Sequence, residues 1–137
     1  MPIESLHHVG YVVARMGPAL TRWLAEGARI LVEPVEDLTL RVTVALLETD
    51  GVLPVELVAP ISADGSPVAA RLRRGGGLDH LCFCVPDLHA RLECELARGA
   101  ILLRAPVLAV AFRREVGFVQ RRSGLVVEFI ATQEVHP

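Results

Sequence analysis

Two histidines and two glutamates recur at the same spacing in this 137-residue sequence. His8 is followed by Glu56 and His80 by Glu128, so 48 residues separate the members of each pair. Each glutamate stands in the middle of an apolar run, where burying an unpaired carboxylate costs several kcal/mol and a partner is expected. Two imidazoles and two carboxylates suit one divalent transition metal ion, whose charge the carboxylates neutralise. We therefore expect these four residues to form one metal site.

The two pairs belong to a longer repeat. Residues 6–28 align with residues 78–100 at a constant offset of 72 without a gap, and the same offset places the second pair on the first. Two similar modules are the economical explanation of a register held over half the chain. If an approximate twofold axis relates the modules, the four ligands converge on that axis.

Each module reads as strand, helix and three further strands. Alternating Val-rich runs predict the strands, and apolar residues at helical spacing, stopped by Gly27 and Gly99, predict the helices. The expected elements are residues 6–13, 17–26, 29–35, 40–48 and 52–59, and then 78–85, 86–98, 101–103, 107–120 (with a break) and 125–131. We expect one α+β domain, with module one at about 1–64, a connector helix at about 65–77 and module two at about 78–137.

Alternation along the first strand of each module assigns the histidines to one face. Bulky residues such as Tyr11 and Phe83 would lie under the module's helix, so His8 and His80 point to the opposite face. Gly10 follows two residues after the first histidine and a cysteine follows two residues after the second. Small side chains there leave room above the sheet, and a hollow is implied.

Composition excludes several classes of protein. With 52% hydrophobic and 22% charged residues the chain can bury a core, and a net charge of −2 gives no footprint for nucleic acid. No apolar run approaches the about 20 residues of a membrane-spanning helix, and no signal peptide is expected. Cys82, Cys84 and Cys94 make an odd count, which favours reduced thiols and a cytoplasmic location.

Three segments carry a resemblance to a known family: LHHVGYVV, VELVAPISADGSPVAARLRRGGGLDHLCFCVPDL and EVGFVQRRSGLVVEF. They resemble the vicinal oxygen chelate (glyoxalase/bleomycin resistance) superfamily, and within it the methylmalonyl-CoA epimerases most. The resemblance implies two tandem βαβββ modules with pseudo-twofold symmetry, forming a curved mixed sheet around a metal cup. It also implies a homodimer that binds an acyl-CoA or other acyl thioester, and one Co, Zn, Mn, Ni or Fe ion. The implied ligands are His8, Glu56, His80 and Glu128.

The reaction implied by the resemblance is removal of the proton next to a thioester carbonyl. Glu128 matches a family ligand that also serves as a base, whereas the second family base, a glutamate, is replaced by Thr43. Glu115 lies 72 residues after Thr43 and is our hypothesis for the missing acid/base group. Arg41 and Arg113 also match at this offset and, with Thr43, are expected to contact the substrate, the arginines by binding an anionic group.

Two other functions stay open from the sequence. One is a different metalloenzyme of the same superfamily, a lyase or decarboxylase acting on an oxygen-rich metabolite. The other is a protein that binds a small molecule without turnover, as the drug-resistance members do. The intact set of two histidines and two glutamates counts against the second. An extradiol dioxygenase is disfavoured, because those enzymes are longer and use the ligands of one module.

Overall fold

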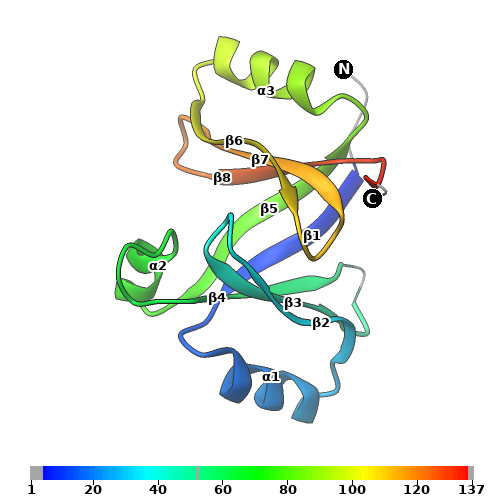
Figure 1. Ribbon diagram of the computed structural model, residues 1–137, viewed down its shortest axis with the longest axis vertical. Coiled ribbons are helices and arrows are strands. Elements are labelled where there is room, and N and C mark those ends of the chain that lie inside the picture. Colours follow the sequence, from blue (N-terminus) through cyan, green and yellow to red (C-terminus); the bar gives the residue numbers. More distant parts are fainter. Residues whose placement is uncertain (1–4, 52, 136–137) are drawn as a thin grey trace. The chain divides into compact units, whose positions relative to one another are not determined.

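The computed structural model describes residues 5–51 and 53–135, which divide into two compact units. The first unit spans residues 8–79, and the second joins residues 80–135 to the first residues of β1. The elements of the first repeat are β1 (Ser5–Val12), α1 (Met16–Ala25), β2 (Arg29–Asp37), β3 (Val42–Glu48) and β4 (Val55–Pro60), followed by α2 (Ala69–Arg73). Those of the second are β5 (Gly77–Val85), α3 (Leu88–Ala97), β6 (Ile101–Ala109), β7 (Arg114–Gln120) and β8 (Val126–Ala131) (Figure 1). The predicted α+β class with two βαβββ modules is confirmed.

Both units contain the same four-stranded mixed sheet. In the first the strand order is β2-β3-β4-β1, and in the second it is β6-β7-β8-β5. The outer pairs are antiparallel hairpins, whereas β1 runs parallel to β4 and β5 runs parallel to β8. A parallel pair needs a long crossover, which the helix and two strands between its members provide. The pseudo-repeat in the sequence is therefore a repeat of topology.

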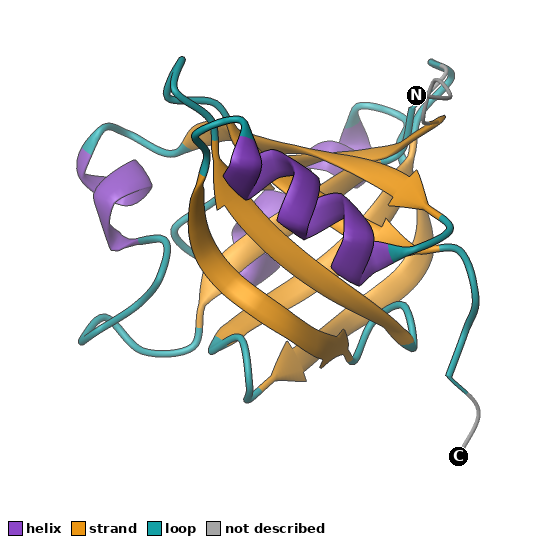
Figure 2. Cartoon of the chain, turned by 90° about the horizontal axis from the view of Figure 1, so that it is seen from above, coloured by secondary structure: helices purple, strands orange, loops and turns teal. Residues whose placement is uncertain are grey.

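Packing under the helix is tighter in the second unit. Asp87 caps α3, because its Oδ1 accepts a hydrogen bond of 3.0 Å from the backbone N–H of Ala90. Figure 2, which views the molecule from the side of α3, shows this helix lying across the strands. The core cluster between α3 and its sheet consists of Val85, Leu88, Leu92, Val119, Val127 and Phe129. By contrast, α1 has no buried residue and contacts Tyr11 through the edge of Trp23.

The structure corrects several predicted element bounds. Residues 101–103 and 107–109, which were expected in two strands, form the single strand β6. The break expected within residues 107–120 is the turn between β6 and β7. The connector helix is one short turn of five residues. That the modules form one domain stays a prediction. Among the described residues, every helix is too short or too polar to cross a membrane.

Candidate metal centre

The first His–Glu pair lies on adjacent parallel strands of the first unit. Gly10 of β1 is in register with Glu56 of β4, so His8 lies two residues away on the same face. Because glycine has no side chain, the carboxylate has room to lean toward the imidazole. Nε2 of His8 lies 3.5 Å from Oε1 of Glu56. Both residues are buried, with 0% and 6% of their surface exposed.

The second unit repeats this arrangement. Cys82 of β5 is in register with Glu128 of β8, and His80 precedes it by two residues on the same face. Nε2 of His80 lies 3.2 Å from Oε1 of Glu128, and the two residues are 6% and 2% exposed. The rings of His80 and Phe118 meet edge to face, with centroids 5.5 Å apart, so Phe118 packs against the imidazole. Each unit thus presents one buried imidazole and one buried carboxylate side by side.

The donor set and its spacing suit a divalent transition metal. Two ligand atoms at about 2.0–2.2 Å from one ion, separated by roughly a right or tetrahedral angle, lie about 3.0–3.5 Å apart. The measured separations of 3.5 and 3.2 Å agree with this spacing. Each pair offers two donors, whereas such ions take four or more. One pair alone is therefore an incomplete site for such an ion.

A cysteine shares the face of the second pair. Cys84 lies on β5 four residues after His80, and burial raises the pKa of its thiol, an effect that the nearby Arg114 guanidinium partly opposes. Burial disfavours the thiolate, which is the form that binds metals. All three cysteines are free, as the sequence predicts. Cys84 is therefore a poor competitor for the histidine and glutamate ligands.

Two predicted acid/base or substrate residues lie on the other face of their sheets. In β3, Leu46 is in register with Glu56 and shares its face of the sheet. Thr43 lies three residues before Leu46, so its side chain points to the opposite face. Val116 shares the face of Glu128, because it is in register with Ile130, two residues along β8. Glu115, the neighbour of Val116, therefore points toward the face that α3 covers. The registers separate Thr43 and Glu115 from the His–Glu pairs, and neither enters the site described here.

The two matched arginines occupy equivalent turns. Arg41 and Arg113 are exposed and immediately precede β3 and β7. Both have left-handed backbone conformations, with φ of 61° and 55°, the only non-glycine residues with positive φ in the described part of the chain. Such a conformation is uncommon for an arginine and costs of order 1–3 kcal/mol. The repeat therefore preserves a strained turn at both positions, and their substrate contacts stay a prediction.

Two side chains of the second unit, Phe118 and Glu95, were not predicted from the sequence. Phe118, which contacts His80, was not singled out because its position depends on the register of β7 and β8. Glu95 is buried on α3 and was also missed. A signal for it existed: it continues the buried stripe of Leu88 and Leu92 at helical spacing, where an apolar residue is expected.

Comparison with known proteins identifies the family. A profile of the Glyoxalase/Bleomycin resistance protein/Dioxygenase superfamily matches residues 7–118. The chain belongs to this superfamily. No curated protein matches the sequence.

Solved structures share the superfamily fold along most of their length. A hypothetical protein from Bacillus halodurans is 23% identical, with a TM-score of 0.81 over 99% of both chains. Methylmalonyl-CoA epimerase from Mycobacterium tuberculosis is 22% identical, with a TM-score of 0.77 over 93% of this chain and 87% of that one. A variant of the Streptomyces coelicolor epimerase in complex with 2-nitronate-propionyl-CoA is 17% identical, with a TM-score of 0.82 over 99% of both chains. Identities this low establish the fold alone.

Proposed function

We propose that the chain is a metal-dependent epimerase or isomerase that removes the α-proton of a 2-substituted acyl thioester such as methylmalonyl-CoA. The observation that carries the proposal is the matched pair of buried His–Glu contacts, one in each unit. Support also comes from the superfamily membership and from the epimerases among the solved structures of the same fold. A buried histidine and carboxylate are not needed twice in register for packing alone.

In this proposal the two pairs share one divalent ion, held by His8, Glu56, His80 and Glu128. The bound ion would polarise the thioester carbonyl and so acidify the neighbouring C–H bond. Glu56 adds negative charge that offsets the ion and fixes the imidazole beside it. Burial of all four side chains keeps bulk water away, which strengthens electrostatic interactions at the reacting carbon.

Glu128 is the proposed base. A carboxylate has two oxygens, so one can serve as a ligand while the other takes the α-proton of the substrate. As the proton moves to Glu128, the electron pair of the C–H bond moves toward the thioester oxygen. Return of a proton to the opposite face of the carbon would complete an epimerisation, and return to the same face would restore the substrate.

A one-base enzyme of the same superfamily is the second candidate, and one observation favours it. Glu115, the hypothesised second acid, and Thr43, which replaces the second family base, both leave the sheet on the face opposite their His–Glu pair. With Glu128 as the single base, the chain would exchange the α-proton without inverting the carbon. It could alternatively act as a lyase or decarboxylase on another oxygen-rich metabolite.

Proton exchange in heavy water tests both candidates. The metal-loaded protein is incubated with one epimer of methylmalonyl-CoA, and deuterium uptake and inversion at the α-carbon are followed separately by NMR. Uptake together with inversion is expected of the epimerase, whereas uptake with retention would favour the one-base enzyme. No uptake with metal-loaded protein would contradict the proposed substrate.

A matched pair of variants tests the base. Glu128→Gln keeps the shape of the side chain but cannot accept the proton, and we expect exchange to fall by about 100-fold or more. Glu134→Gln alters an exposed carboxylate shortly after the same strand and should leave exchange unchanged. Equal rates for the two variants would remove Glu128 from the mechanism.

The oligomeric state and the location complete the proposal. On the resemblance we propose a homodimer, which light scattering would report as twice the chain mass of 14.9 kDa. A cytoplasmic location is proposed on the three free cysteines, since a reducing compartment keeps thiols free.

A further inference from the structure

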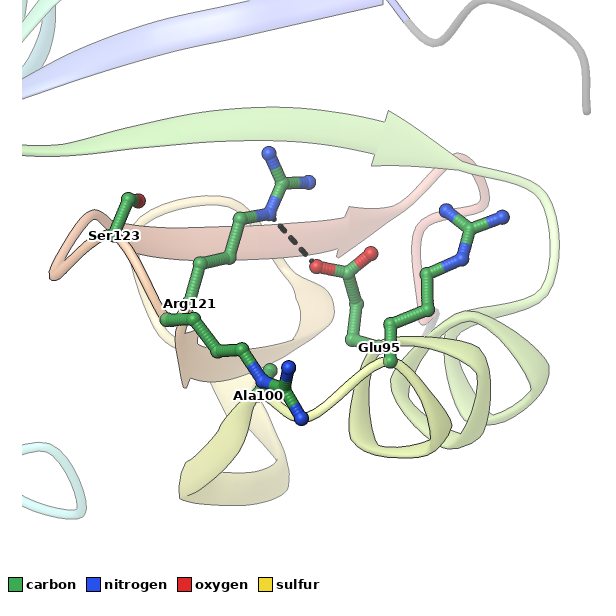
Figure 3. A pocket seen from close by; sticks show the side chains of 6 residues that line it. Glu95, Ala100, Arg121 and Ser123 are labelled. Carbon is green, nitrogen blue, oxygen red and sulfur yellow. Dashed lines mark hydrogen bonds and ion pairs between the residues drawn. The ribbon is translucent and has the colours of Figure 1, made fainter.

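The second unit carries a pocket that the proposed chemistry does not use. It lies between the C-terminal end of α3 and the turn that joins β7 to β8, and it has a volume of about 330 Å³ (Figure 3). Its lining residues are Glu95, Arg98, Ala100, Arg121, Arg122 and Ser123. Three arginines and one glutamate therefore line a space large enough for a small polyatomic ion.

The single carboxylate is fully engaged at the base of this pocket. Glu95 is only 3% exposed, and its Oε1 accepts a hydrogen bond of 2.8 Å from Nε of Arg121. Its Oε2 accepts a hydrogen bond of 3.3 Å from Nε of Arg91, whose guanidinium also lies over the ring of Phe129. Because Arg121 is held through Nε, its two terminal nitrogens extend beyond the ion pair, as Figure 3 shows. Glu95 thus orients Arg121 without using its terminal donors.

The other two arginines bring charge that nothing nearby neutralises. Within residues 5–51 and 53–135, Arg98 and Arg122 have neither an ion pair nor a side-chain hydrogen bond. The Arg122 side chain lies against the backbone of Gly99, where an added Cβ would come within 2.7 Å of its Cζ. Arg122 therefore packs closely over Gly99 at the edge of the pocket. Three arginines against one glutamate leave the lining with two excess positive charges.

The repeat shows that the fold does not require this charge. The offset of 72 places Glu95, Arg98, Arg121 and Arg122 on Trp23, Glu26, Thr49 and Asp50 of the first unit. The four matched positions therefore carry no arginine in the first copy, whereas three of them are arginines in the second. An arginine cluster that the βαβββ module can do without needs a separate explanation.

Capping of the helix does not supply that explanation. Cations are favoured near the C-terminus of a helix, where the last carbonyl groups lack partners. The carbonyls of Cys94, Glu95 and Leu96 already accept hydrogen bonds from the backbone N–H groups that follow α3. The side-chain donors of Arg98 and Arg122 are left for another acceptor.

We propose that this pocket is an oxyanion site that binds a phosphate dianion, either free phosphate or the terminal group of a phosphate ester. Guanidinium groups match the tetrahedral oxygens of phosphate through paired N–H donors, and the Ser123 hydroxyl can add one more. A dianion would offset the two excess charges of the lining. The site is independent of the proposed metal centre and of the reaction proposed there.

Isothermal titration calorimetry with the full chain tests the site, with inorganic phosphate and phenyl phosphate as probes at constant ionic strength. We expect saturable binding, and a loss of affinity of about tenfold or more in the double variant Arg98→Ala/Arg122→Ala. The double variant Arg73→Ala/Arg74→Ala removes two exposed arginines near α2 and should bind like the unmodified chain. Each single variant, Arg98→Ala or Arg122→Ala, should lose less affinity for phosphate than the double variant. The single variants serve as the test if the double variant fails to fold.

The outcomes separate the two sources of phosphate from the absence of a site. Tighter binding of phenyl phosphate identifies a phosphate ester as the ligand, and tighter binding of inorganic phosphate identifies the free ion; both support the pocket. The proposal is overturned if neither probe binds saturably, or if the two double variants bind with equal affinity.

Discussion

Ionisable side chains in the middle of β-strands are costly unless they have partners, and both units meet this cost in the same way. A histidine lies beside each buried glutamate, at 3.5 Å in the first unit and 3.2 Å in the second. A residue without a bulky side chain, Gly10 or Cys82, stands in register with the glutamate and leaves room for the contact. The four residues were predicted from spacing alone, because a matched pair in two apolar strands has few structural explanations.

Glu95 offers a direct test of a buried carboxylate outside the proposed metal centre. Glu95→Gln removes the charge that pairs with Arg91 and Arg121, and we expect it to lower the free energy of unfolding by about 1–3 kcal/mol. Urea denaturation measures this change. Glu93→Gln, an exposed position on the same helix, should change stability little. Equal effects at the two positions would mean that the buried ion pairs contribute no net stability.

The thiol of Cys84 has a predictable dependence on pH. Burial raises its pKa, so the reactive thiolate forms at higher pH than in an ordinary cysteine. In a Cys94→Ser variant, with Cys82 fully buried, alkylation by iodoacetamide reports on Cys84. We expect the rate to stay below that of free cysteine near pH 8 and to keep rising at more alkaline pH. A plateau at or below the pH of free cysteine would contradict the raised pKa.

Strand register decides which predicted residues can act together. Alternation along β1 and β5 correctly assigned His8 and His80 to one face, because each strand was considered by itself. Thr43 was assigned by the family resemblance and Glu115 by the sequence offset from it, and neither carries information about faces across neighbouring strands. The observed pairings turn both toward the face opposite the His–Glu pairs. A one-residue difference in register would reverse this outcome, and the nearly continuous apolar run of β3 specifies the register only weakly.

The contact between α3 and β7 is sensitive to added volume. A Cβ at Gly117 would lie 2.8 Å from Cδ1 of Leu92, a core residue of α3. We expect Gly117→Ala to lower the free energy of unfolding by about 1–3 kcal/mol, because the helix must shift away from its sheet. Gly17→Ala in α1 meets open space and should instead stabilise the chain by about 0.4–1 kcal/mol. Thermal unfolding of the two variants checks the opposite signs, and a destabilised Gly17→Ala would show that α1 is constrained in some other way.

The chain as a whole is two copies of one architecture that differ on their surfaces. The topology, the His–Glu pairs and the strained arginine turns recur in both units. The surfaces do not: α3 buries three residues and borders a basic pocket, whereas α1 buries none. Shared features were predictable because the repeat makes them visible in the sequence. The pocket was not, because its arginines come from distant segments that only the fold brings together.

The number of ions bound per chain tests whether the two copies act as one site. If one ion is shared, the unmodified chain binds about one divalent ion. Either His8→Ala or His80→Ala then lowers the affinity for that ion by about tenfold or more. The double variant His8→Ala/His80→Ala then has no second site to lose, so the effects of the two single variants on affinity are not additive. Independent sites would instead give about two ions per chain, and one for each single variant. Elemental analysis and competition with a chelator measure both quantities, and His89→Ala, an exposed histidine on α3, serves as the control. Two ions per chain would leave the proposed enzyme without its shared centre.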